Sequence, residues 1–280
     1  MTLLETLLIL VALFLFSLVP ALFYLLWIRK TERYHTESWS AVSRAFLYGA
    51  VVGTFVAAIL EAVLFALYAQ VLQPDLGGAL PKGSTAEYPL LALVIAPFVE
   101  EGIKGLGVYG MRSRISYLAD GMVLGAAVGL GFGFLENLLY GVSALAAGVT
   151  VAILTIAIRS FSSMLIHASA TSVTGYGVAA NLQQGGQGHV LAGSYLAAVG
   201  IHGSYNAIAS LTLILPLLGL ALPGYGIDLV SIASLMLAIV YGLSAFGFIR
   251  QRITEVQFLT ALPVVARPSP RPTPQIPRSR

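Results

Sequence analysis

The chain contains no cysteine, and only 10% of its 280 residues are charged. Without cysteine there can be no disulfide, no thiolate metal site and no cysteine nucleophile. The scarcity of charge excludes an ordinary soluble domain, in which about 25% of residues are charged. In place of charge the chain carries 58% hydrophobic residues, and its mean hydropathy is +0.87. The composition therefore predicts an all-α, polytopic transmembrane helix bundle.

Seven apolar stretches are each long enough to cross a bilayer as a helix. They cover residues 3–27, 45–72, 88–111, a fourth stretch from about 121, and then about 150–180, 189–215 and 229–249. An eighth span, or a re-entrant segment, at 216–228 stays open as an alternative. We expect residues 1–250 to form the bundle, with a motif-bearing core at about 88–215. Residues 251–280 are rich in proline and arginine, and we expect them to form a disordered tail.

The basic residues predict the orientation of these spans. Of the 15 lysines and arginines, Lys104 and Arg159 fall inside expected spans. With seven spans, twelve of the others lie on one side of the membrane: four in the first loop, two in the second and six from Arg250 onward. Only Lys82 lies on the opposite side. The positive-inside rule then places the N-terminus outside and the tail in the cytoplasm.

A pair of acidic residues interrupts the third span. Glu100 and Glu101 stand beside Lys104 in an apolar run, although an ionisable group at this depth costs about 2.5–3.5 kcal/mol on insertion scales. Glu100 and Lys104 are four residues apart and share a helix face, so they can form an ion pair. Glu101 points about 100° away around the helix, and one Glu–Lys pair does not explain it. Pro97, just before the pair, predicts a kink or a local opening of the helix.

Polar residues recur at similar depth in three other expected spans. They are Glu136 in the fourth span, His167 in the fifth, and His202 with Asn206 in the sixth. Each residue alone is explained more simply as a hydrogen-bonded packing residue. Their coincidence with the acidic pair instead indicates a functional site inside the bundle.

Three further intramembrane features have a structural interpretation. We expect Arg159 to be the partner of one of the buried acids, and Glu61, in the second span, to be a packing or ion-pair residue. The fourth span carries a glycine at every fourth position, which predicts a face where a neighbouring backbone approaches closely. These glycines are Gly121, Gly125, Gly129 and Gly133.

The absence of two well-known protease motifs limits the catalytic mechanisms that the chain could use. No Gly-x-Ser-x-Gly motif is present, which argues against a serine nucleophile, and Asp120 and Asp228 lie at span ends, unlike the paired aspartates of intramembrane aspartyl proteases. Carboxylates with imidazoles suit the activation of water, in which a glutamate takes the proton. In that version His202 and Asn206, which share a helix face, are the donors for the oxyanion.

A metal site is the alternative. Glu136, His167 and His202 could form a His₂Glu zinc set, with a glutamate of the acidic pair as the base. The spacing of these residues is long-range, so the sequence contains no local metal-binding motif. The sequence requires no cofactor, and zinc is the candidate if the site binds one.

The order and spacing of these residues resemble the PrsW family of intramembrane proteases, which is related to the CAAX prenyl endopeptidases. The similarity runs from about Ala96 to Asn206. It is carried by Glu100-Glu101-x-x-Lys104, Phe132-x-x-x-Glu136, His167 after Arg159-Ser160, and His202-x-x-x-Asn206.

The resemblance implies a peptidase that cleaves within or beside the membrane, with a membrane-anchored anti-sigma factor as the substrate of the PrsW type. It implies that Glu100 is the base that activates water and that Glu101 and Lys104 organise it. Glu136 stands where the CAAX enzymes have a histidine, so prenylated substrates are not implied. The other catalytic residues that the resemblance implies are His167, and His202 with Asn206 on the oxyanion side.

We therefore expect an intramembrane endopeptidase, glutamate-dependent or metal-dependent, in a prokaryotic cell membrane. Its expected partners are the lipid bilayer and a membrane-anchored protein or peptide, with no nucleic acid, and the sequence does not fix an oligomeric state. Two alternatives from other classes are a non-catalytic membrane scaffold or chaperone of the same superfamily and an ion or proton transporter. The full set of polar residues favours the peptidase, because a scaffold could lose some of them and because no internal repeat of a transporter is evident.

Overall fold

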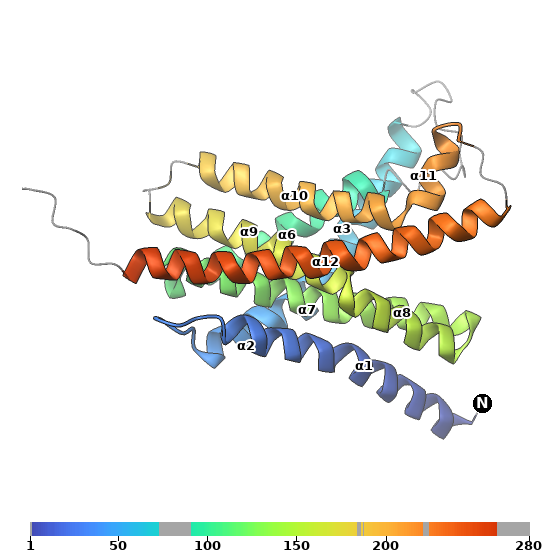
Figure 1. Ribbon diagram of the computed structural model, residues 1–280, viewed down its shortest axis with the longest axis horizontal. Coiled ribbons are helices and arrows are strands. Elements are labelled where there is room, and N and C mark those ends of the chain that lie inside the picture. The colour runs from blue at the N-terminus through green and yellow to red at the C-terminus, as the bar shows by residue number, and fades with distance from the viewer. Residues whose placement is uncertain (1, 73–90, 184–185, 187, 221–223, 262–280) are drawn as a thin grey trace, which may run out of the picture.

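The protein is a bundle of helices lying roughly alongside one another, as seen in a computed structural model (Figure 1). The structure describes the chain except for residues 1, 73–90, 184–185, 187, 221–223 and 262–280. The described part contains no β-strand. The predicted all-α membrane bundle is thus confirmed.

The N-terminal part of the bundle consists of three α-helices and two π-helical segments. They are α1 (Leu3–Arg29), α2 (Trp39–Leu47), η1 (Tyr48–Gly53), α3 (Thr54–Leu67) and η2 (Tyr68–Leu72). After the gap in the description, the chain continues with η3 (Leu91–Ile95), α6 (Ala96–Gly110), η4 (Arg112–Arg114), α7 (Leu118–Ala144) and η5 (Leu145–Ala147). The last part consists of α8 (Val149–Phe161), α9 (Ser163–Gln183), α10 (His189–Ala209), α11 (Leu211–Leu217) and α12 (Gly224–Ala261).

Five helical stretches of the described chain are long and apolar enough to cross a membrane. They are Leu3–Arg29, Trp39–Gln70, Leu118–Ala147, Val149–Gln183 and Asp228–Leu259. The two other expected spans correspond to η3 with α6, and to α10. These two carry the acidic pair and His202, so the polar residues of the candidate site lower their hydropathy. In the expected tail, α12 runs on to Ala261, and the rest of that segment lies outside the described residues.

The start of the second span, which the sequence places at residue 45, differs from the expectation. The sequence predicts a loop up to Arg44, whereas α2 begins at Trp39. The reason is a helix cap: the hydroxyl of Ser38 accepts a hydrogen bond from the backbone N–H of Ala41 at 3.2 Å.

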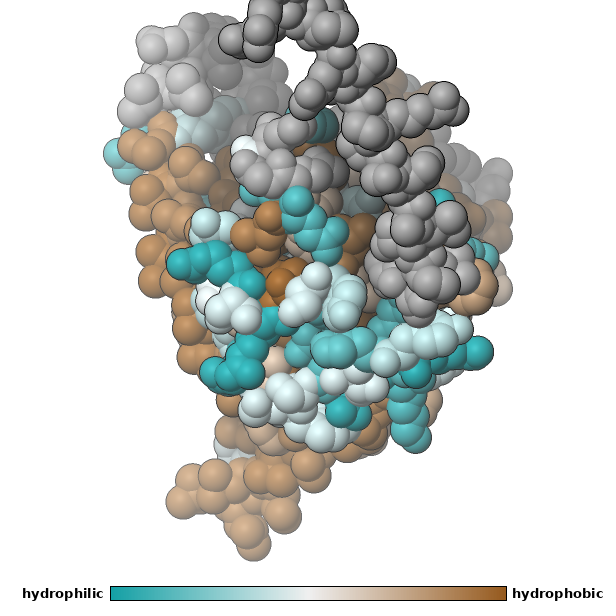
Figure 2. All heavy atoms as spheres, turned by 90° about the vertical axis from the view of Figure 1, so that its left-hand side faces the viewer, coloured by the Kyte–Doolittle hydropathy of each residue, from teal (hydrophilic) through white to brown (hydrophobic). Residues whose placement is uncertain are grey.

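One end of the bundle is polar, while its sides are apolar. Figure 2 looks at the left-hand end of Figure 1 and shows hydrophilic residues gathered there, with hydrophobic residues along the visible flank. Exposed arginines of this end come from three segments: Arg33 after α1, Arg112 and Arg114 between α6 and α7, and Arg252 in α12.

Helix α7 is the centre of the bundle. Of its most apolar stretch, 89% is buried inside the protein, against 17% for α1. Its glycine stripe packs against α9 as predicted: a methyl group on Gly129 would overlap the backbone carbonyl oxygen of His167, and one on Gly125 would overlap that of Thr171. The stripe therefore sets how closely His167 approaches α7.

The expected fifth span is broken into two helices at Ser162, whose backbone (φ −128°, ψ −86°) is not helical. The Ser162 hydroxyl bonds to the carbonyl of Ile158 at 2.9 Å and lies 3.0 Å from the hydroxyl of Tyr205 on α10. The break separates Arg159, at the end of α8, from His167, near the start of α9. Both side chains reach the same carboxylate, as described below.

The helix around Pro97, where the sequence predicts a kink or a local opening, changes from a π-helical to an α-helical turn. The π-helical turn η3 runs directly into α6, and Pro97 lies in the first turn of α6, where its missing N–H costs least. The side-chain amide of Asn206 donates to the carbonyl of Ala92 in this turn at 2.7 Å. Asn206 thus ties α10 to η3, the turn that leads into α6 and its acidic pair.

Candidate active site

Four helices bring the predicted polar residues together. Helix α6 supplies Glu100, Glu101 and Lys104, α7 supplies Glu136, α9 supplies His167, and α10 supplies His202 and Asn206. Except for Glu136 and Asn206, which are partly exposed, these side chains are buried. Burial of so many ionisable groups is costly unless they compensate one another.

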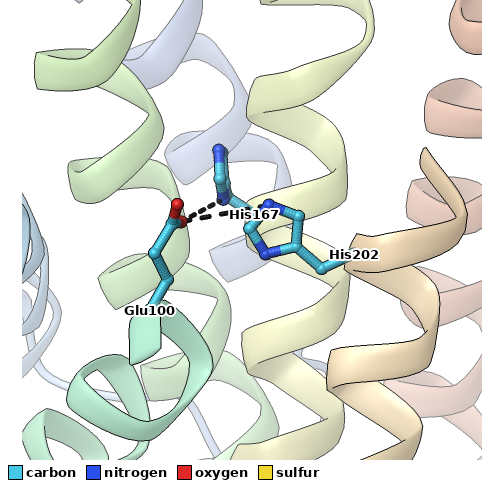
Figure 3. A group of neighbouring side chains, drawn as sticks. All are labelled: Glu100, His167 and His202. Carbon is cyan, nitrogen blue, oxygen red and sulfur yellow. Dashed lines mark ion pairs between the residues drawn. The ribbon is translucent and has the colours of Figure 1, made fainter. Parts of the chain in front are cut away.

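The centre of the site is formed by one glutamate and two histidines. Figure 3 shows the side chains of Glu100, His167 and His202 pointing toward one another from three helices. Glu100 Oε2 lies 3.7 Å from His167 Nδ1 and 3.9 Å from His202 Nε2. One ligand atom from each residue lies within 4.8 Å of the other two. A carboxylate and two imidazoles are a donor set that zinc uses in catalytic sites.

A second carboxylate orients each imidazole. His202 Nδ1 lies 3.1 Å from Glu101 Oε1, and His167 Nε2 lies 2.7 Å from Glu136 Oε2. An ionised carboxylate only accepts hydrogen bonds, so each of these nitrogens carries the proton and donates. The inward nitrogens, His202 Nε2 and His167 Nδ1, are then left with lone pairs. Metal-binding histidines are typically oriented in this way.

Lys104 is the cation at the back of the site. Its Nζ lies 2.7 Å from Glu101 Oε1, 3.1 Å from Glu100 Oε2 and 2.9 Å from His167 Nδ1. It also lies 4.2 Å from the centroid of the Phe132 ring. The ammonium compensates the acidic pair, and it donates to the nitrogen that would bind a metal ion. An ion at His167 Nδ1 would require the ammonium to withdraw toward Glu101.

Arg159 is the partner of Glu136, which confirms the expectation that it pairs with a buried acid. Its Nη2 lies 2.7 Å from Glu136 Oε2 and donates to the hydroxyl of Ser163 at 3.0 Å. Its Nε donates to the side-chain oxygen of Asn137 at 3.0 Å. The guanidinium also lies 3.8 Å from the centroid of the Tyr140 ring. Arg159 is therefore fixed at the wall of the site by several contacts at once.

A cavity of about 500 Å³ gives access to this constellation. Its charged and imidazole lining comes from Glu61, Glu100, Glu136, Arg159, His167 and His202. Glu101 and Lys104 do not line it, so they act from behind the other site residues. Asn206 lines the cavity, but its amide already donates to the carbonyl of Ala92.

The residues fit a divalent metal ion. Three carboxylates, Glu100, Glu101 and Glu136, face two permanent cations, Lys104 and Arg159, which leaves a net negative charge in a buried site. Glu100 Oε2 is buried, and its one charged partner is Lys104 Nζ at 3.1 Å, in an ion pair that lacks the alignment of a good hydrogen bond. A further cation at this oxygen would satisfy it and balance the charge.

The ligand set differs from the one that the sequence suggests. The sequence suggests Glu136 with His167 and His202 as a possible ligand set, whereas in the structure Glu100 lies with the two histidines. The cause is that Glu136 Oε2 is occupied by Arg159 and by the outer nitrogen of His167.

Two supporting residues escaped the sequence analysis. Thr171 donates to Glu101 Oε2 at 3.0 Å, and the hydroxyl of Ser163 lies 3.2 Å from His167 Nε2. Both lie four residues from His167 in α9, one after it and one before it. Their position on the histidine's own helix face was the available signal.

Fold and site together define a helical membrane protein with a buried Glu/His/His constellation open to a cavity. A family model for the PrsW family intramembrane metalloproteases matches residues 37–247, and the chain belongs to this family. No curated protein and no solved structure matches the chain. The matched region contains every predicted site residue.

Proposed function

We propose that this protein is an intramembrane endopeptidase in which Glu100, His167 and His202 bind a catalytic divalent metal ion, with zinc the best fit to the donors. The observation that carries the proposal is the convergence of their three ligand atoms within 4.8 Å, with a carboxylate behind each histidine. Membership of a protease family favours this function over a scaffold or a transporter.

Each residue of the site would have a distinct role in the reaction. A bound metal ion supplies a Lewis acid that activates water and polarises the scissile carbonyl. Glu101 and Glu136 fix the two imidazoles through their outer nitrogens, and Lys104 compensates the acidic pair. Arg159 holds a positive charge at the cavity wall, where it stabilises the oxyanion that develops on the substrate. The cavity admits the substrate, and the surrounding helices exclude lipid.

A metal-free version uses the same residues in other roles. There Glu100 takes the proton from water, since its Oε2 has no hydrogen-bond partner and Glu100 lines the cavity. The ammonium of Lys104 then remains where the structure has it, between Glu100 and His167. The geometry of the histidines favours the metal-dependent version, because both present a lone pair to Glu100.

The proposed substrate is a membrane-anchored protein, and an anti-sigma factor is the type that the family resemblance implies. We further propose a prokaryotic cell membrane, with the polar end of the bundle in the cytoplasm and the N-terminus outside. In that orientation the site lies in the outer part of the membrane: Glu100 is near the start of α6 and Glu136 is nearer the end of α7 than its start. Cleavage is then expected near the outer surface.

The test is cleavage of membrane-anchored model substrates by the purified protein in liposomes. The wild type should cleave, whereas Glu100→Gln, His167→Ala and His202→Ala should each lose at least a hundredfold in rate, because each removes a metal ligand or the base. Glu255→Gln, on the exposed part of α12, is the matched control and should cleave like the wild type. Wild-type rates in all three site variants would refute the catalytic assignment.

A further inference from the structure

Glu61 is a cavity-lining acid that the proposed mechanism does not use. It lies in the middle of α3, and α3 packs against α6, the helix of the acidic pair. Its side chain lines the same cavity as Glu100 and Glu136. It interacts electrostatically with Glu136 and with Lys104, so it lies within range of the site's charges.

The other acids of the site are paired, whereas Glu61 has no ion-pair partner among the residues that the structure describes. Glu136 lies 2.7 Å from Arg159, and Glu100 lies 3.1 Å from Lys104. Glu61 forms no ion pair with any residue that the structure describes, and its Oε1 is buried without a hydrogen-bond partner. From the sequence we expect a packing or ion-pair residue at this position, and the described part of the chain contains no such ion pair.

Packing alone does not account for this residue. A carboxylate within a membrane span costs about 2.5–3.5 kcal/mol on insertion scales, and an apolar residue would pack against lipid and α6 without that cost. Glu61 is also absent from the ligand group formed by Glu100, His167 and His202. An unpaired acid that faces a substrate cavity instead resembles a specificity determinant, because it favours a ligand of opposite charge and rejects one of like charge.

We propose that Glu61 binds a cationic side chain of the substrate, lysine or arginine, close to the bond that is cleaved. This inference rests on the proposed endopeptidase function and adds a substrate class to it: membrane-anchored proteins with a basic residue beside the scissile bond. The pairing occurs in a cavity inside the bundle, where an ion pair is screened less than at an open protein surface. Arg159 lines the same cavity and repels the basic side chain of the substrate. It therefore favours binding of that side chain near Glu61.

The test uses a set of model substrates with one apolar helix and a flanking segment, in which a lysine is moved position by position. Glutamine and glutamate replace the lysine in parallel sets. At one position the wild type should cleave the lysine substrate at least tenfold faster than the glutamine substrate. Glu61→Gln should reduce that ratio to about one, and Glu61→Lys should invert the preference toward glutamate. Glu255→Gln, remote from the cavity, should keep the wild-type ratio.

A binding measurement separates this inference from the proposed function. The fluorescence anisotropy of labelled lysine and glutamine peptides is measured with wild-type protein and Glu61→Gln in liposomes, and their thermal unfolding confirms that both are folded. A lysine preference that disappears in Glu61→Gln supports the inference even if no substrate is cleaved, an outcome that would refute the endopeptidase alone. Equal binding and equal cleavage of lysine and glutamine substrates by the wild type would overturn the inference, as would a preference that survives Glu61→Gln.

Discussion

His202 Nδ1 lies 3.1 Å from Glu101 Oε1, and the same carboxylate oxygen lies 2.7 Å from Lys104 Nζ. This contact turns the other imidazole nitrogen toward Glu100. It also explains the second glutamate of the pair, which a single ion pair with Lys104 leaves unexplained, because Glu101 orients a histidine from behind the cavity wall. Comparable residues behind metal ligands usually change metal affinity or activity by about 10–100-fold when replaced.

Replacement of Glu101 by glutamine should therefore weaken metal binding. The amide oxygen can still accept a hydrogen bond from His202, but it carries no charge to polarise the imidazole or to balance Lys104. We expect an affinity for zinc about 10–100-fold lower, measured by competition with a chromogenic chelator. An affinity within twofold of the wild type would show that Glu101 does not act through His202.

Arg159 and Glu136 should stabilise the fold as a coupled pair, so that loss of one partner costs more stability than loss of both. Arg159→Met leaves Glu136, whose side chain is mostly but not fully buried, without its cation, and we expect it to cost up to about 3–5 kcal/mol of stability. The double variant Arg159→Met with Glu136→Gln should recover a large part of this loss without recovering cleavage. Thermal unfolding of the two variants in detergent measures the difference. Strictly additive effects would mean that the pair is not coupled.

The contact between α7 and α9 should tolerate no added methyl group at Gly129. Alanine there would overlap the carbonyl of His167, so α9 must shift and carry the imidazole away from Glu100. We expect Gly129→Ala to lower both the melting temperature and the cleavage rate. Gly200→Ala on α10 is the matched control, because nothing lies within 4 Å of the added methyl group. Equal effects of the two substitutions would contradict the role assigned to the stripe.

We expect the stability of the protein to depend on pH through Glu32, which lies in the segment between α1 and α2. Burial, opposed by a backbone hydrogen bond from Glu37 and reinforced by the charge of that residue, raises the pKa of Glu32 to about 8. The folded state therefore binds a proton more tightly than the unfolded state, and the stability from this group is present at low pH and is lost as pH rises from about 4.5 to 8.

Glu32→Gln should remove this dependence. Its melting temperature should exceed that of the wild type by a few degrees at pH 8.5 and by less at pH 5, since about 1 kcal/mol corresponds to roughly 2–4 °C for a chain of this size. Scanning calorimetry across this pH range measures the effect. The same difference at both pH values would refute the assignment to Glu32.

Much of the fold could be predicted from the sequence, because membrane spans are determined mainly by length and hydropathy. The glycine stripe of α7 also correctly predicted the close approach of a neighbouring backbone, which the structure shows to be that of α9. The break at Ser162 could not be predicted, since no proline or glycine marks it. It is stabilised by the contact of Ser162 with Tyr205, 43 residues further along the chain.

The composition of the site was more predictable than its pairing. Order and spacing of the polar residues placed the acidic pair, Glu136 and both histidines in one site. Which glutamate faces the histidines depends on the rotation of α6 and α7 about their axes, and spacing along separate helices does not determine this. Arg159 decides the question, because it engages Glu136 and leaves Glu100 to the inward nitrogens.

The most direct test of the account is to measure bound metal and cleavage in the same preparation. The protein is stripped with a chelator in liposomes, then titrated with zinc, and metal content and cleavage rate are recorded at each step for the wild type and for His167→Ala with His202→Ala. The account predicts that wild-type cleavage disappears on stripping and returns in proportion to about one ion per chain, while the double variant binds no ion and does not cleave. Full wild-type cleavage in stripped protein with no detectable metal would contradict it.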